Sequence, residues 1–410
     1  MQFLSVTNKT ENRKIIIFTI ALLLSEVVFW GFMVLTRGRY LTSYFINDIY
    51  DTSMDYYNML ANISDLKPYK FNSNYPALYF CILRVIYHMI PIFPNGDDGT
   101  FLRSLEYAQL GYIVLCIVLI YIWGLMTIKM CEKAGVISRV LALAIMLSGP
   151  FLFLIERGNS LLFAITGIIV FLNYYDNPQK WMRYLAYFSL SIAVGVKIYP
   201  VVFGILIISK KRWKEALHCI IIGSCIFFLP FFAFDGIKDI KTMIYGILLS
   251  GEIQQNVGTN YNYSLINIIK IVEDIFGVNI VLPNAIILVC VIIFCGLLYV
   301  TSDDLWRKIL SLSMICIWIP KFSYTYTLLL LLPPLIIFLT TKMKRIDIVY
   351  GVLFLIMFAP IGLPQVNASS MDKFPLSYTT VLVNLSLILL NIIVLIDNLY
   401  AKNIIREGKR

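Results

Sequence analysis

Charged residues are scarce in this sequence, and so are the residue patterns of water-soluble enzymes. Asp, Glu, Lys and Arg make up 14% of its 410 residues, whereas 59% are hydrophobic; a soluble globular chain carries about 25% charged residues. Only two histidines are present and the eight cysteines form no CxxC pair, so neither a metal site nor a Ser-His-Asp triad is indicated. The sequence also has no Walker motif, no glycine-rich nucleotide loop and no visible internal repeat. We therefore expect no cofactor, and the need for a metal ion stays open.

The net charge of +10 does not indicate nucleic-acid binding. Proteins that bind nucleic acid gather Lys and Arg on a hydrophilic face, whereas here these residues lie between apolar stretches. Basic residues in that position mark the cytoplasmic side of a membrane protein. Nucleic acid is thus not an expected partner, and membrane lipids are.

Apolar stretches long enough to cross a bilayer recur along the whole chain. About 20 apolar residues span the hydrocarbon core. Such stretches lie near residues 15–35, 75–93, 107–128, 136–153, 159–175, 184–209, 215–233, 281–300, 308–319, 326–340, 346–362 and 378–399. They predict a single transmembrane domain over residues 1–410, an all-α polytopic bundle of about 12 helices with short amphipathic helices in its outer loops.

The basic residues predict the orientation of this bundle. Lys9, Arg13 and Lys14 precede the first apolar stretch, which is too long for a cleaved signal peptide and is interpreted as a signal anchor. Lys and Arg are more frequent on the amino-terminal side of the membrane, and Asp and Glu are more frequent on the other side. We expect a multi-pass protein of the plasma membrane with both termini in the cytoplasm.

The apolar block 184–209 is unusual because basic residues border both of its ends, which predicts that both ends are cytoplasmic. Lys197, Tyr199 and Pro200 stand at its middle, so we interpret it as a broken pair of short helices. A cation at that depth is costly unless it reaches water, a carboxylate or a phosphate. The phosphate of a lipid carrier would supply the anion. An ion pair, for instance with Glu156, or exposure at the outer rim are the alternatives.

Residues 37–75 form the first predicted extracytoplasmic loop and contain a cluster of acids. If residues 47–62 are helical, polar side chains recur at spacings of three and four on one helix face, namely Asp48, Asp51, Asp55, Asn58 and Asn62. A carboxylate near a membrane surface is suited to accept a proton from a sugar hydroxyl. A solvated loop helix whose acids only face water explains the same spacing.

Three further polar groups fall on the same predicted side of the membrane. They are Glu156 to Asn159 at an outer turn, Asn260 to Leu265 at the end of a second large loop (234–263), and Pro320 to Tyr326 at another turn. Aromatic and Asn residues are common at membrane interfaces, so each group alone is weak evidence. Their shared side favours chemistry at the outer surface.

Several of these residues stand in ordered motifs. Arg157-Gly158-Asn159-Ser160 is followed by an apolar stretch, by Lys197-Ile198-Tyr199-Pro200 and by Lys211-Arg212-Trp213. Upstream lie Asp51, Pro68-Tyr69 and Tyr75-Pro76-Ala77-Leu78; downstream lie an Asn-x-Ser-Leu motif at Asn262 and a Pro-x-x-Ser turn ending at Ser323. Over about residues 45–340 this order resembles glycosyltransferase family 87, a branch of the GT-C superfamily of membrane glycosyltransferases. Its pattern is RGQxN, an apolar span and AxxxKxYP before RRW, and the KxYP block is the most specific element.

The resemblance implies an inverting hexosyltransferase of the EC 2.4.1 type. Its partners would be a polyprenyl-phosphate-linked sugar donor, commonly of mannose, and a lipid or glycan acceptor outside the membrane. It implies Asp51 as the general base, with Asp55 as a second catalytic candidate. It also implies donor-phosphate ligands at Lys197, Arg157 and Lys321, pocket residues at Asn159, Tyr199, Asn262, Ser264 and Tyr326, and no metal ligand.

The sequence departs from the family pattern at a few positions. Ala77 replaces the second proline of the first-loop motif, the Gln of RGQ is missing, and Asp55 stands where Tyr is frequent. The turn after Ser323 has no His. Two other functions stay open, a polysaccharide polymerase and a lipid-linked-sugar flippase or other transporter. A transporter places charged residues along a path near the midplane, so their gathering on one side favours the enzyme.

Overall fold

The computed structural model describes residues 12–46, 51–63, 66–89, 98–255, 259–280, 282–366 and 376–407. Within these ranges the regular elements are helices, and one isolated bridge joins Gln365 and Ser377. The chain forms two compact units, each described here by itself. Unit 1 contains residues 1–45, 128–152 and 254–410, and unit 2 contains residues 46–127 and 153–253.

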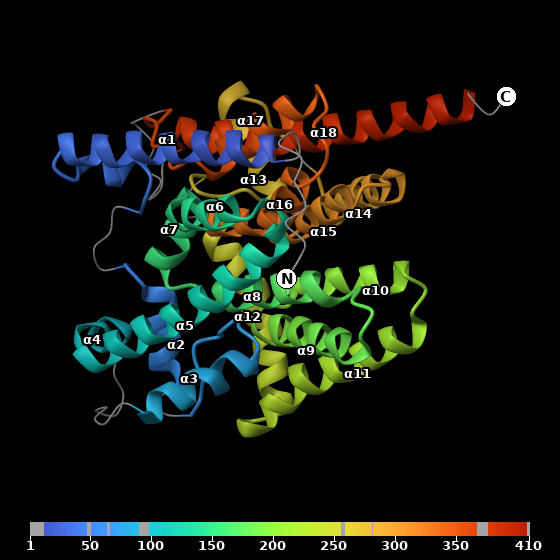
Figure 1. Cartoon of the computed structure of the whole chain (residues 1–410). Coiled ribbons are helices and arrows are strands. Elements are labelled where there is room, and N and C mark those ends of the chain that lie inside the picture. The colour runs from blue at the N-terminus through green and yellow to red at the C-terminus, as the bar shows by residue number, and fades with distance from the viewer. Residues whose placement is uncertain are drawn as a thin grey trace. The chain divides into compact units, whose positions relative to one another are not determined.

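Unit 2 is built around a set of packed helices that includes α2, the helix of the first loop (Figure 1). Helix α9 packs against α8 and α11, and α2 packs against α3 and α4. Beneath α2 lies a buried core that includes Tyr56, Tyr79 and Phe80. The elements of this unit are α2 (Met54–Asn62), α3 (Ala77–Met89), α4 (Gly99–Ser104), most of α5 (Glu106–Met130), the end of α7 (Gly149–Arg157), α8 (Leu161–Tyr174), α9 (Lys180–Val196), η3 (Tyr199–Gly204), α10 (Ile205–Ser209), α11 (Trp213–Phe228), η4 (Leu229–Ala233) and most of α12 (Ile237–Gln255).

Unit 1 contains helices from the amino-terminal part and from the carboxyl-terminal part of the chain. Helix α1 packs against α6 and α17, and α14 packs against α15 and α18. Buried Arg307 of α15 binds Asp397 and Asn398 of α18, so a paired charge ties these helices together. The elements are α1 (Arg13–Leu35), η1 (Arg39–Ser43), η2 (Glu132–Ala134), α6 (Val136–Leu147), the start of α7, α13 (Leu265–Phe276), α14 (Asn284–Thr301), α15 (Leu305–Trp318), η5 (Thr325–Leu331), α16 (Leu332–Leu339), α17 (Asp347–Phe358) and α18 (Tyr378–Glu407).

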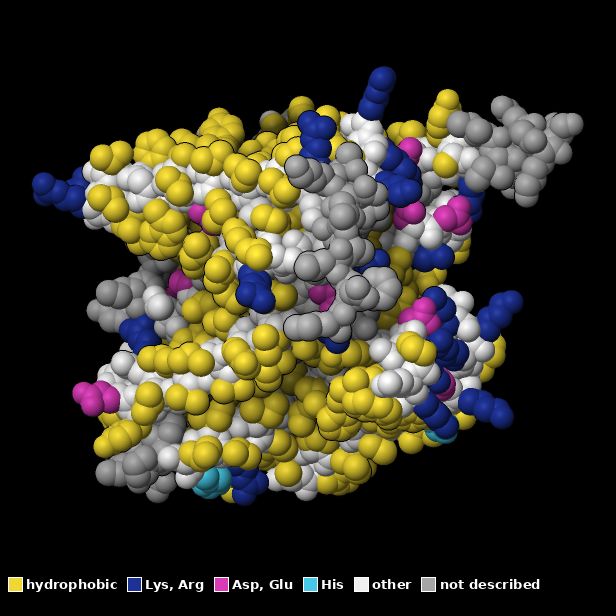
Figure 2. All heavy atoms as spheres, viewed as in Figure 1, with side chains coloured by type: hydrophobic (Ala, Val, Ile, Leu, Met, Phe, Trp, Pro, Cys, Tyr) yellow, Lys and Arg dark blue, Asp and Glu magenta, His cyan; other side chains and the backbone are white. Residues whose placement is uncertain are grey.

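Many helices expose apolar side chains on their surface, as is expected of a membrane protein. In the described residues, five helical segments are long and apolar enough to cross a bilayer: 13–35, 106–130, 213–233, 284–301 and 378–402. The pair 136–147 and 149–157, bent by 53°, could form a sixth span. Only 17% of the most apolar part of α5 is buried, and Figure 2 shows hydrophobic side chains over much of the visible surface. The chain is therefore a membrane protein whose described part is built from helices.

The predicted total of about 12 spans stays a prediction, because several expected spans contain short helices. The stretch 326–340 is one example, since it begins as the 3-10 helix η5 and becomes the α-helix α16 only at Leu332. Pro333 and Pro334 at this junction have no backbone N–H to donate into the preceding turn. A long regular helix through this stretch is thus disfavoured.

The acidic loop helix is shorter than the sequence spacing predicts. Helix α2 begins at Met54, and Ser53 before it has φ of 58°, in the left-handed region that interrupts a helix. Asp51 therefore precedes the helix, and the expectation of one helix over residues 47–62 is wrong there. Asp48 lies outside the described residues. Asp55 is in the first turn of α2.

Candidate active site

A glycine turn after α7 brings the Glu156–Asn159 group against the first loop. Gly158 has φ of +65°, a conformation that other residues rarely adopt. A Cβ at this position would lie 3.0 Å from Tyr56 Cβ and 3.1 Å from the Ser53 carbonyl oxygen. The Ser53 amide donates to the Glu156 carbonyl at 2.7 Å, which fastens the two segments. Glycine thus permits an approach between parts of unit 2 that are far apart in sequence.

Arg157, at the end of α7, holds both candidate carboxylates. Its NH1 donates to the Asp51 carboxylate at 2.7 Å and to the Asp51 backbone carbonyl at 3.0 Å, and its NH2 lies 3.5 Å from the Asp55 carboxylate. The Arg157 side chain is 5% exposed, whereas those of Asp51 and Asp55 are 31% and 24% exposed. The planar guanidinium suits such a fork of charge-assisted bonds. The two carboxylates are therefore fixed in place and still reachable from solvent.

Asn159 completes the support of Asp55. Its Nδ2 donates to the Asp55 carboxylate at 2.7 Å and to the Tyr75 hydroxyl at 3.2 Å, while its Oδ1 accepts from the Leu161 amide at 2.9 Å. The side chain is buried, and both ends of its amide are used. Asn159 therefore orients other groups from the turn between α7 and α8.

Lys197 stands where α9 ends. Its backbone is extended (φ −140°, ψ 129°), which stops the helix before η3, and Tyr199 begins that short helix two residues later. The Lys197 Nζ lies 4.3 Å from the centroid of the Tyr75 ring. A cation over an aromatic face gains up to about 2 kcal/mol when shielded from water. The ion pairs in the described part of the chain do not include Lys197, so its N–H groups remain available to an anionic ligand.

Lys197 stands in the extended break between α9 and η3, outside the five helical segments that are long and apolar enough to cross a bilayer. Burial lowers the pKa of the Lys197 ammonium to about 8, and the negative charge of Asp55 opposes this shift. The ammonium is therefore charged near neutral pH but loses its proton under mildly alkaline conditions. The charge of Asp55 thus acts on Lys197 although the two side chains form no direct ion pair.

The two downstream groups meet in unit 1. The Asn262 Oδ1 accepts from the amides of Ser264 and Ser323, at 3.1 and 2.9 Å. Ser264 donates from its hydroxyl to the Lys321 carbonyl at 3.0 Å and caps α13 by accepting from the Asn267 amide. The side chains of Asn262 and Ser264 thus hold two loops together.

Tyr326 follows the second of these loops. It is buried in η5, with its ring centroid 5.7 Å from that of Tyr324. The structure therefore brings one set of predicted site residues into neighbouring segments of unit 1, namely Asn262, Ser264, Lys321 and Tyr326. The other set belongs to unit 2 and consists of Asp51, Asp55, Arg157, Asn159, Lys197 and Tyr199.

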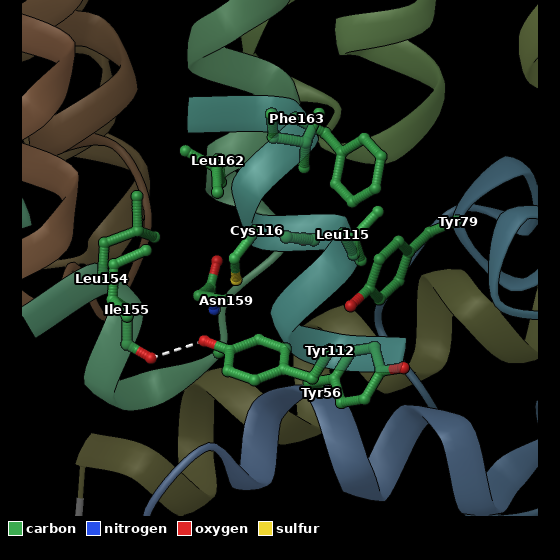
Figure 3. Close-up of a pocket in the computed structure, with 13 residues that line it drawn as sticks. Tyr56, Tyr79, Tyr112, Leu115, Cys116, Leu154, Ile155, Asn159, Leu162 and Phe163 are labelled. Carbon is green, nitrogen blue, oxygen red and sulfur yellow. Dashed lines mark hydrogen bonds between the residues drawn. The ribbon is translucent and has the colours of Figure 1, made fainter. Parts of the chain in front are cut away.

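A small cavity lies behind Asn159 (Figure 3). Its volume is only about 20 Å³, and it is lined mainly by aromatic and aliphatic side chains. On its rim the Tyr112 hydroxyl donates to the Ile155 carbonyl at 2.6 Å, which fastens α5 to α7. The cavity therefore belongs to the packing that supports the Arg157 turn.

Tyr75 is the site residue that sequence reasoning did not select. The only signal was its place in the first-loop motif, directly before Pro76. Nothing local indicated that its ring would meet Lys197 or that its hydroxyl would meet Asn159. Among the described residues, no three His, Cys, Asp or Glu side chains converge as metal ligands would.

These features describe a helical membrane protein in which two carboxylates, an arginine and a lysine lie in unit 2, and comparison with known families places it further. The family model of glycosyltransferase family 87 matches residues 100–321, more than half of the chain, and the chain belongs to this family. Neither the curated proteins nor the solved structures contain a match. The matched region includes Arg157, Asn159 and Lys197, whereas Asp51, Asp55 and Tyr75 precede it.

Family membership confirms the resemblance in the sequence. The protein is a membrane glycosyltransferase, and its substrates are a sugar donor and an acceptor.

Proposed function

We propose that this protein transfers a hexose, with mannose as the first candidate, from a polyprenyl-phosphate carrier to a glycolipid or surface glycan. The transfer takes place on the extracytoplasmic side of the plasma membrane and inverts the anomeric carbon. The proposal includes a GT-C-like bundle of about 12 spans with cytoplasmic termini. One observation carries it: two fixed, reachable carboxylates share unit 2 with the Lys197 ammonium, which forms no ion pair with a carboxylate among the described residues.

The carboxylates serve the acceptor. Asp51 takes the proton of the acceptor hydroxyl while that oxygen attacks the anomeric carbon, and Asp55 is the alternative base. The bond between the anomeric carbon and the phosphate oxygen breaks, and its electron pair stays on the phosphate. Lys197 stabilises this departing charge, which in a site of low dielectric constant is a large contribution to the rate.

Arg157 acts on the carboxylates in this scheme. The family resemblance implies a contact with the donor phosphate, but both terminal nitrogens of Arg157 already donate to Asp51 and Asp55. The third nitrogen, Nε, is buried, so a phosphate would reach Arg157 mainly by competing with these bonds. We therefore propose that Arg157 orients the base, and that Lys197 is the principal phosphate ligand.

An apolar groove supports a carrier with a long hydrocarbon chain. It lies between α9, the η3–α10 segment and α11, and most of its lining is aliphatic or aromatic, including Val194, Ile198 and Phe227. Ile198 directly follows Lys197 in the chain and Val194 precedes it by three residues, so the groove passes close to the Lys197 backbone. Gly204 and Gly223 also line it and keep it open.

A donor comparison tests the proposed function. Purified protein in lipid vesicles is given radiolabelled mannose on polyprenyl phosphate or on a nucleoside diphosphate, with membrane lipid extract as the acceptor pool. Transfer to a new glycolipid from the lipid-linked donor alone is expected. Transfer from the nucleotide donor alone would contradict the carrier. Absence of transfer from several polyprenyl-phosphate sugars would contradict the proposed function.

A further inference from the structure

One aromatic residue, Tyr75, connects the Lys197 ammonium with the group that holds the Asp55 carboxylate. Tyr75 carries the Lys197 ammonium on its ring, 4.3 Å from the centroid, and its hydroxyl accepts from Asn159 Nδ2 at 3.2 Å. The same Nδ2 donates to the Asp55 carboxylate at 2.7 Å. A continuous line of contacts therefore runs from the cation through Tyr75 and Asn159 to the acid.

Tyr75 is itself held firmly. It precedes Pro76, and a residue before proline is disfavoured in the helical conformation, so α3 cannot extend back through it. The Tyr69 hydroxyl donates to the Tyr75 carbonyl at 2.9 Å, and the ring of Tyr75 packs 5.3 Å from that of Tyr79. The side chain is only 9% exposed. Because its backbone, its ring and its hydroxyl are all held, the Tyr75 side chain can fix the positions of the groups that contact it.

We infer that Tyr75 is a positioning residue for sugar transfer, whose ring places Lys197 for the donor phosphate and whose hydroxyl, through Asn159, places the Asp55 carboxylate. This inference rests on the proposed function. It assigns separate tasks to two parts of one side chain. The ring acts on donor binding, because it sets where the ammonium lies. The hydroxyl acts on the chemical step, because it helps to set where the carboxylate lies.

The two tasks can be separated by two substitutions. Tyr75→Phe keeps the ring and removes the hydroxyl, so kcat should fall about tenfold, as expected for one lost hydrogen bond that acts in the transition state. The donor KM and the affinity for polyprenyl phosphate should stay within twofold of wild type. Tyr75→Leu removes the ring as well, so polyprenyl phosphate should bind about tenfold more weakly and the donor KM should rise.

Tyr79→Phe is the matched control. Tyr79 is a neighbouring buried tyrosine on α3, and its ring packs on Tyr75. Removing its hydroxyl tests whether loss of any buried phenol in this core slows the enzyme. We expect its kcat and donor KM to match those of wild type.

The readouts are initial transfer rates, which give kcat and donor KM, and a separate equilibrium binding assay with polyprenyl phosphate alone. A Tyr75→Phe enzyme with wild-type kcat would overturn the role of the hydroxyl, and so would an equal loss in Tyr79→Phe. Unchanged polyprenyl-phosphate affinity in Tyr75→Leu would overturn the role of the ring. If wild type transfers no sugar, the proposed function fails, and the binding assay alone still decides the role of the ring.

Discussion

The Arg157 NH1 group donates two hydrogen bonds to Asp51, one to the carboxylate at 2.7 Å and one to the backbone carbonyl at 3.0 Å. The second bond fixes the main chain just before α2, so the guanidinium positions the residue as well as its charge. The other terminal nitrogen, NH2, lies 3.5 Å from the Asp55 carboxylate, and a lysine has only one nitrogen to serve both aspartates. This geometry favours the proposal that Arg157 orients the base.

Arg157→Lys should therefore lower kcat by about 100-fold, a loss of about 2.7 kcal/mol in transition-state stabilisation, while the donor KM changes by less than twofold. Lysine keeps the positive charge but loses the geometry of the hydrogen bonds to the aspartates, so kcat should fall while the donor KM hardly changes. Steady-state kinetics with varied donor concentration checks it. Arg139→Lys, at an exposed arginine of α6, is the control and should behave as wild type. A large rise in donor KM with little change in kcat would instead make Arg157 a phosphate ligand.

The alkaline side of the pH profile should report Lys197. Its pKa of about 8 means that the ammonium is present below this pH and is lost as the pH rises through it. Because kcat/KM follows the ionisation of the free enzyme, it should fall about tenfold per pH unit above pH 8. Lys197→Arg keeps its charge at every accessible pH and should extend the plateau upward, even if its maximum is lower. An alkaline limb at the same pH in both enzymes would contradict this assignment.

The apolar groove can be filled without displacing the protein around it. Among the described residues, a Cβ on Gly204 meets no heavy atom within 4 Å, and one on Gly223 meets only the Ser191 Oγ, at 3.5 Å. Gly204→Leu and Gly223→Leu should therefore fold and occupy the space proposed for the hydrocarbon chain. We expect the KM for a long-chain donor to rise about tenfold, while a donor with a short isoprenoid chain is used as well as by wild type.

Gly296→Leu is the control for groove filling. Gly296 lies on α14, outside the groove, and a Cβ there also meets nothing within 4 Å in the described structure. This variant should use both donors as wild type does. Equal use of the long-chain donor by all four enzymes would place the carrier elsewhere.

Local patterns in the sequence were sufficient for several elements of the structure. The apolar runs became helices, because backbone groups in hydrocarbon must bond within their own segment. The charged and proline-containing middle of block 184–209 is the place where α9 ends and η3 begins. Each of these features depends on residues a few positions apart.

Local sequence patterns could not predict contacts between residues that lie far apart in the chain. The acids at spacings of three and four predicted one helix over residues 47–62, but the left-handed backbone at Ser53 starts α2 only at Met54. Nothing near Arg157 in the sequence indicated that it would bind Asp51 and Asp55, which precede it by about 100 residues. The part of Tyr75 in the site likewise depends on α8 and α9, which come much later in the chain.

The most direct test of the central claim is sugar transfer from radiolabelled polyprenyl-phosphate-mannose by wild type, Asp51→Asn and Asp55→Asn in the same lipid. Asparagine keeps the shape of the side chain but cannot take the hydroxyl proton, so Asp51→Asn should lose at least about 1,000-fold in kcat with little change in donor KM. Asp55→Asn should retain measurable transfer. Wild-type rates in both variants would contradict a carboxylate base held by Arg157, and a loss confined to Asp55→Asn would move the base to that residue.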